Sequence, residues 1–108
     1  MQAFSVHENL VFHDPNPYAE PLFVSPTGRV LRFALRPGQV VREHTAPSSP
    51  VYLVTLQGTG AYSGGDGQEQ SFGPGTLLIF DVGEPHAIRA ADEEVVFLAF
   101  LHGAPLAA

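Results

Sequence analysis

The sequence predicts an all-β protein of one domain, built as a sandwich or barrel of short strands. Three observations lead to this prediction. Ten prolines and eleven glycines interrupt the 108 residues too often for long helices. The segments between them are short and rich in Val, Leu, Ile, Phe and Tyr, which favour strands. No window keeps a helical period over three turns.

The strands are expected in the apolar runs between turn residues. The clearest runs are 28–35, 39–44, 51–56, 75–80, 86–90 and 94–102. A weaker candidate lies at 4–12 and a short one at 69–72, and the separators, such as "RPGQ" and "FGPG", are typical of turns. The Pro-rich stretch 13–28 is expected to be a surface connection. We therefore expect one domain over 1–108, with its core motifs in 28–101 and an N-terminal arm and connection in 1–27.

Composition excludes several classes of function. The net charge of −6 argues against nucleic-acid binding, which needs a basic face. The absence of cysteine excludes disulfides and thiolate metal sites. The N-terminus lacks the pattern of a signal peptide, and no apolar stretch is long enough to cross a bilayer. We expect a cytoplasmic protein that contacts neither nucleic acid nor membranes.

Two segments share a layout in which five residues separate a glycine from a chemically important position. In the first segment this glycine is Gly38 and the position is His44, and Gly58 follows further along the chain. In the second segment they are Gly75 and Asp81, followed by Gly83 and His86. The spacing resembles the two motifs of the cupin family, G-x5-H-x-H-x4-E-x6-G and G-x5-P-x-G-x2-H-x3-N. The resemblance covers roughly residues 28–101. It implies a double-stranded β-helix, a jelly-roll barrel with a site in its cavity.

The resemblance also implies a degenerate metal site. The first-motif ligand positions, which are His, His and Glu in cupins, fall on His44, Ala46 and Val51. In the second motif, His86 matches the remaining ligand. Two of the four implied ligands are therefore small or apolar.

Losing the glutamate removes the only negative charge from the implied metal shell. His44 and His86 can still hold one divalent ion weakly, such as Zn, Ni, Fe, Mn or Cu, with water completing the shell. A tighter site would need a recruited ligand, for which Glu84 in the rim loop is the better candidate and His102 a further one. Alternation places Glu43 outside. The alternative is that both histidines are simply hydrogen-bonded inside the barrel mouth.

Arg42 shares the alternation of Val40 and His44, which predicts that it faces the cavity mouth. Its guanidinium would then hold a carboxylate or phosphate of a ligand. The alternative is a rim arginine in water or paired with a nearby acid. The other expected pocket positions are apolar: Ala46, Val51, Leu53, Ile88 and Phe80.

Three functions stay open at this stage. The first is a binding module for a small molecule that can be anionic, with Arg42, His44, Val51 and His86 as ligand-binding residues. The alternative is a metal-dependent oxygenase or isomerase that uses His44 and His86 with a recruited ligand. A metal-free isomerase or epimerase ranks last, because no tyrosine has an obvious inward position to act as the acid. A homodimer is expected on general grounds, since pairing of two copies hides an edge strand.

Overall fold

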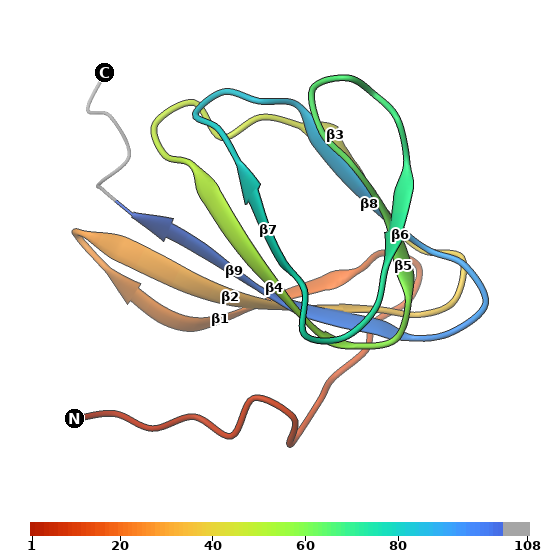
Figure 1. Cartoon of the computed structure of the whole chain (residues 1–108). Helices are drawn as coiled ribbons and strands as arrows, with labels where there is room; N and C mark the ends of the chain where they lie inside the picture. The colour runs from red at the N-terminus through yellow and green to blue at the C-terminus, as the bar shows by residue number, and fades with distance from the viewer. Residues whose placement is uncertain (103–108) are drawn as a thin grey trace.

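The computed structural model describes residues 1–102 as two facing antiparallel sheets, with no helix in this part of the chain (Figure 1). The strands are β1 (Tyr18–Ser25), β2 (Gly28–Leu35), β3 (Val40–His44), β4 (Val51–Gln57), β5 (Gly60–Ser63), β6 (Gln70–Phe72), β7 (Leu77–Phe80), β8 (His86–Ala90) and β9 (Val95–His102). One sheet has the order β1-β2-β9-β4-β7 and the other β3-β8-β5-β6. The chain crosses repeatedly between the sheets, as in a jelly roll. The predicted fold class is confirmed, and no helix within 1–102 could span a membrane.

The core lies between the two sheets and is filled from alternating strand positions. Phe97, Leu35, Leu53 and Val95 are among its largest fully buried side chains. The Phe97 ring stacks on Phe33 of β2, with centroids 4.8 Å apart. Burial of these inner faces is the main driving force for folding. It also fixes the strand register, because a slip by one residue would turn every apolar side chain outward.

The N-terminal part of the chain differs from the prediction. The expected strand at 4–12 is absent, and the expected connection at 13–28 contains β1. Proline in this run obscured the strand, because proline cannot donate a ladder hydrogen bond. β1 tolerates Pro21 because it is an edge strand, and its pairing with β2 is irregular between Pro21 and Phe23. Strand β5, which follows Gly58 closely, was also missed.

A one-residue β-bulge interrupts β3 where it pairs with β8. Val41 pairs with Ile88 and His44 pairs with His86, so three steps on β3 match two on β8. An extra residue reverses the alternation of side chains along the bulged strand. Val41 and His44 therefore both face inward, although they are an odd number of residues apart.

Gly58 closes the first motif for a steric reason. Its φ is +75°, in the left-handed region that favours glycine, and a Cβ there would overlap the carbonyl oxygen of Glu94. The turn between β4 and β5 can therefore pack against the start of β9 only when this position carries no side chain.

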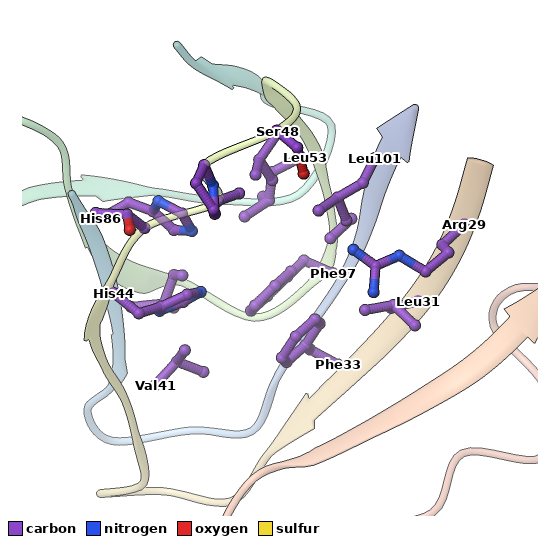
Figure 2. Close-up of a pocket in the computed structure, with 16 residues that line it drawn as sticks. Arg29, Leu31, Phe33, Val41, His44, Ser48, Leu53, His86, Phe97 and Leu101 are labelled. Carbon is purple, nitrogen blue, oxygen red and sulfur yellow. The ribbon is translucent and has the colours of Figure 1, made fainter. Parts of the chain in front are cut away.

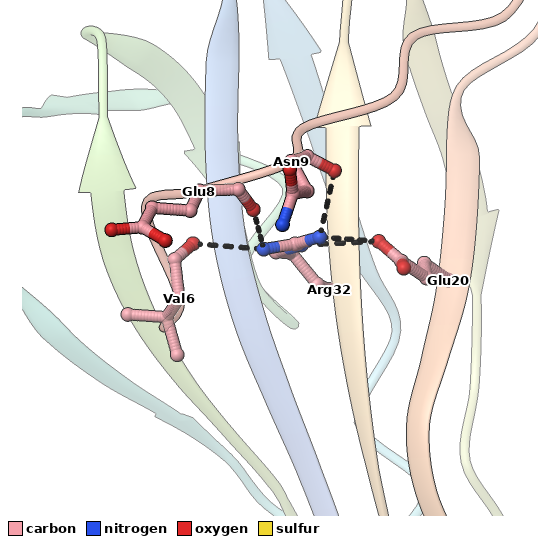
Figure 3. Close-up of polar contacts among 5 residues, drawn as sticks. All are labelled: Val6, Glu8, Asn9, Glu20 and Arg32. Atoms are coloured by element: carbon pink, nitrogen blue, oxygen red, sulfur yellow. Dashed lines mark hydrogen bonds and ion pairs between the residues drawn. The ribbon is translucent and has the colours of Figure 1, made fainter. Parts of the chain in front are cut away.

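Arg32 attaches the N-terminal arm, residues 1–17, to the outer face of β2. It alternates with the inward-facing Leu31, yet only 5% of Arg32 is exposed. Its guanidinium donates to the main-chain oxygens of Val6, Glu8 and Asn9 at 2.8 to 3.2 Å (Figure 3). A further bond reaches the Glu20 carboxylate of β1 at 2.7 Å. The arm thus covers part of an otherwise open apolar sheet face.

Replacing Arg32 by methionine should loosen the arm and destabilise the fold. The change leaves three carbonyl oxygens and a carboxylate without their donor, and we expect a loss of about 2–4 kcal/mol in the free energy of unfolding. Urea unfolding measures the loss, and limited proteolysis within 1–17 should become faster. Arg89→Met is the matched control, because its ion pair with Glu69 is half exposed. Equal effects of the two substitutions would contradict this role for Arg32.

Candidate functional site

A cavity of about 270 Å³ opens between the two sheets at one end of the sandwich. Its body is apolar, and its walls include Leu31, Phe33, Leu53 and Phe97 (Figure 2), together with Val51 and Ala99. The volume lies just below the usual range for drug-sized ligands, so the cavity suits a small molecule. Among the described residues that line it, only histidine, arginine, serine and threonine have polar side chains.

His44 and His86 form one wall of this cavity, as predicted. β3 and β8 place them as direct partners across the bulge, and their rings meet edge to face with centroids 4.2 Å apart. His86 is buried, with 4% exposed, whereas His44 lies at the open mouth. The pair therefore extends from solvent into the cavity.

The hydrogen bonds of the two rings define their tautomer. Nδ1 of His44 lies 2.9 Å from the main-chain oxygen of Arg42, and Nδ1 of His86 lies 2.9 Å from that of Glu84. A carbonyl oxygen only accepts, so each Nδ1 must carry the proton. In the neutral rings, each Nε2 then has a free lone pair. The rings project into the cavity (Figure 2), which gives this wall two hydrogen-bond acceptors.

Burial favours the neutral form of His86. Desolvation is the largest influence and lowers the pKa of His86, and the neighbouring His44 adds to the lowering. The hydrogen bond to the Glu84 carbonyl and the Glu84 charge oppose it, but the net direction is downward. Phe80 stacks on the His86 ring, with centroids 4.7 Å apart, and shields it from the other side.

Arg29 enters the cavity from the opposite wall, a position that was not predicted from the sequence. It lies on β2, where it shares the inward face with Leu31 and Phe33. Figure 2 shows its guanidinium directed toward the space between the walls. The simple alternation of β2 was the signal that could have found it.

Arg42 does not line this cavity, so its predicted inward position is wrong. It is exposed on the outer side of β3, beside Asn16 and Val40. The bulge is the physical reason. It lies between Val41 and His44, so the side chains of Arg42 and His44 no longer point to the same face of the strand.

The two proposed additional metal ligands also lie elsewhere. The Glu84 carboxylate accepts from the main-chain N–H groups of Gly65 and Asp81, each at 2.8 Å, which lowers its pKa. His102 is exposed and stacks on Tyr52. Neither of them lines the cavity.

The metal-ligand positions of the first motif fit an ion only in part. Ala46 and Val51 line the cavity, as expected, but offer no donor atom. Within residues 1–102, no group of three or more His, Cys, Asp or Glu side chains could hold a metal ion. At the other two motif positions, His44 and His86 each keep a free Nε2, because a main-chain carbonyl fixes the proton on Nδ1.

The other predicted cavity residues divide into two groups. Leu53 and Ile88 line the cavity, whereas Phe80 lies behind His86 and borders a separate hollow beside β5 and β6.

Tyr62 is inward and 2% exposed, contrary to the prediction, and burial raises its pKa to about 12. It borders that same hollow and not the histidine cavity, so it is not placed to act as an acid there.

The lowered pKa of His86 predicts a pH dependence of stability. The ordinary value is 6.5, so below it the unfolded chain binds the proton more readily than the folded one. The contribution of His86 to the free energy of unfolding is therefore fully present above its ordinary pKa. It is lost as the pH falls below that value, toward the lower pKa of His86 in the folded protein. Urea unfolding from about pH 7.5 to 5.5 should show a loss that is smaller in His86→Phe.

Long-range ¹H–¹⁵N spectra should show Nδ1–H tautomers for both rings, and an Nε2–H tautomer at His86 would contradict the assigned hydrogen bonds.

Comparisons with known proteins agree with this architecture. The chain aligns over 97% of its length with TT1209 from Thermus thermophilus, covering 100% of that chain, with a TM-score of 0.89 and 22% identity. A Klebsiella pneumoniae protein with a double-stranded β-helix domain matches over 99% of this chain and 94% of its own, with a TM-score of 0.89 and 19% identity. KdgF from Halomonas matches over 94% and 92%, with a TM-score of 0.79 and 12% identity.

These identities are low, so the structural matches establish the fold alone. A search of curated proteins finds no match. The sequence itself matches the family model described as the Cupin domain over residues 31–101, which include both motifs and every strand from β3 to β8. The chain therefore belongs to the cupin family.

Proposed function

We propose that this cupin domain binds a small molecule in the cavity between its sheets. The observation that carries the proposal is the composition of that cavity, an apolar body with two imidazole lone pairs on one wall. Binding sites for small molecules are typically apolar with few polar groups that orient the ligand. Ala46 and Val51 leave room for an organic ligand at positions where cupins carry bulkier metal ligands.

We propose that His44 and His86 bind a divalent ion only weakly. Both Nε2 atoms can bind Zn, Ni, Fe, Mn or Cu, and such an ion would polarise a ligand oxygen. Because no carboxylate lines this cavity among the described residues, the ion would lack a negatively charged protein ligand. A dication in an apolar cavity without such a charge is costly. Metal would then assist binding at most.

The alternative of a metal-dependent oxygenase or isomerase has less support. It needs a third protein ligand, and the Glu84 carboxylate is already held by two main-chain N–H groups. His102 stacks on Tyr52 outside the cavity. The binding function therefore fits these side chains better than an enzyme with a tight metal centre.

The homodimer stays a prediction. Strand β7 is at the edge of its sheet, and its Leu77 and Ile79 are 59% and 55% exposed. Exposed apolar edges of this kind favour association, which would bury them.

Closing the cavity mouth should abolish ligand binding while the fold is kept. In the presence of a chelator, some members of a panel of small acids, amides, alcohols and sugars should raise the Tm of the wild type by several degrees. Ala46→Trp places a large side chain at the mouth and should remove those shifts. Ala87→Trp, at a half-buried position of β8 that does not line the cavity, should keep them. The proposal fails if no compound shifts the Tm, or if Ala46→Trp responds like the wild type.

Metal content should stay well below one ion per chain. Elemental mass spectrometry on untagged protein, after incubation with each of the five metals and desalting, measures it. The residual binding should disappear in the double variant His44→Ala, His86→Ala. Close to one tightly held ion per chain would contradict a weak site and revive the enzyme alternative.

A further inference from the structure

Among the described residues, Arg29 is the one formal charge on the wall of the cavity. The chain has eleven acidic residues, yet none of those in the described part lines the cavity. Three of the other four arginines, Arg32, Arg36 and Arg89, pair with an acid. Arg29 forms no ion pair or side-chain hydrogen bond within residues 1–102. A half-buried guanidinium on an apolar wall is therefore available to a ligand.

From this placement we infer that the cavity selects a monocarboxylate, whose carboxylate binds Arg29 and whose far end carries a hydrogen-bond donor for His44 and His86. The inference rests on the proposed binding function. A guanidinium matches a carboxylate with two parallel hydrogen bonds, which are stronger than bonds between neutral groups. The cavity thereby attracts an anion, although the protein as a whole is negative.

The charge count favours a carboxylate over a phosphate. A phosphate monoester carries about −1.5 to −2 charges near neutral pH. Arg29 is the one formal charge that the described lining residues offer, so it compensates one of these charges. The second charge would remain unpaired in an apolar cavity, which is costly.

The two walls also define the orientation of the ligand. The Nε2 atoms of His44 and His86 are acceptors, because their Nδ1 atoms donate to carbonyl oxygens. A carboxylate beside these lone pairs would be repelled, whereas a hydroxyl or an N–H group would donate to them. Apolar side chains such as Phe97 and Leu31 also line the cavity (Figure 2), and they are available to contact a hydrocarbon spacer. A small ω-hydroxycarboxylate has this order of groups.

Matched acids and amides test the anion site. A graded series of ω-hydroxycarboxylates is titrated by calorimetry against the corresponding primary amides, which have the same shape without the charge. In the wild type, at least one acid should bind roughly tenfold or more tightly than its amide, the size expected for a charge-assisted pair. Arg29→Met should remove this preference. Arg42→Met makes the same change of charge outside the cavity and should keep it.

The outcomes separate the two claims. If acids and amides bind equally to the wild type, or if Arg29→Met keeps the preference, the anion inference is wrong while the cavity remains a binding site. If neither series binds but other compounds of the panel still shift the Tm of the wild type, the inference fails and the proposed function stands. If no compound of either set binds, both fail. Circular dichroism of Arg29→Met confirms that its fold is intact.

A second arm tests the orientation. Removing the terminal hydroxyl, from an ω-hydroxycarboxylate to the plain carboxylate, should weaken binding severalfold in the wild type. In the double variant His44→Phe, His86→Phe, which keeps both rings without an acceptor nitrogen, that difference should vanish while the preference for acid over amide remains. A hydroxyl effect of the same size in this double variant would overturn the assigned orientation.

Discussion

The β-bulge in β3 is the constraint on which the cavity depends. Without it, the period of two along the strand would place Val41 and His44 on opposite faces of the sheet. The extra residue brings both of them inward and sets the His44 ring against His86, 4.2 Å between centroids. It also leaves Arg42 outside, so the positive charge of the cavity comes from Arg29 on the facing sheet. The local geometry of one strand thus determines which groups a ligand can meet.

The chemistry of the site follows from what the two walls hold and lack. One wall offers two imidazole acceptors, kept in a single tautomer by main-chain carbonyls. The other offers a guanidinium without a protein partner among residues 1–102, and the space between is apolar. Where cupins have a second histidine and a glutamate, Ala46 and Val51 contribute volume instead of donor atoms. Such a cavity is better suited to an organic molecule with polar groups at its two ends and an apolar middle than to a tightly held cation.

The sequence could predict the parts that depend on regular alternation and on motif spacing. The all-β class, most strands and the inward positions of His44, His86, Val51 and Leu53 were obtained in this way, and the structure confirms them. Arg42 could not be placed, because a bulge leaves no mark in the pattern of apolar residues. The direction of Glu84 depends on N–H groups of a distant turn at Gly65, and β1 was hidden by a proline that only an edge strand tolerates. The inward position of Arg29 could have been predicted, since the side chains of β2 alternate without interruption.

The most direct measurement is a crystal structure of the protein with the ω-hydroxycarboxylate that binds most tightly. The proposed arrangement of the two walls predicts the carboxylate in a two-bond contact with the Arg29 guanidinium, and the hydroxyl within hydrogen-bonding distance of Nε2 of His44 or His86. A carboxylate at the histidine wall, or a molecule bound outside the cavity near Arg42, would contradict it.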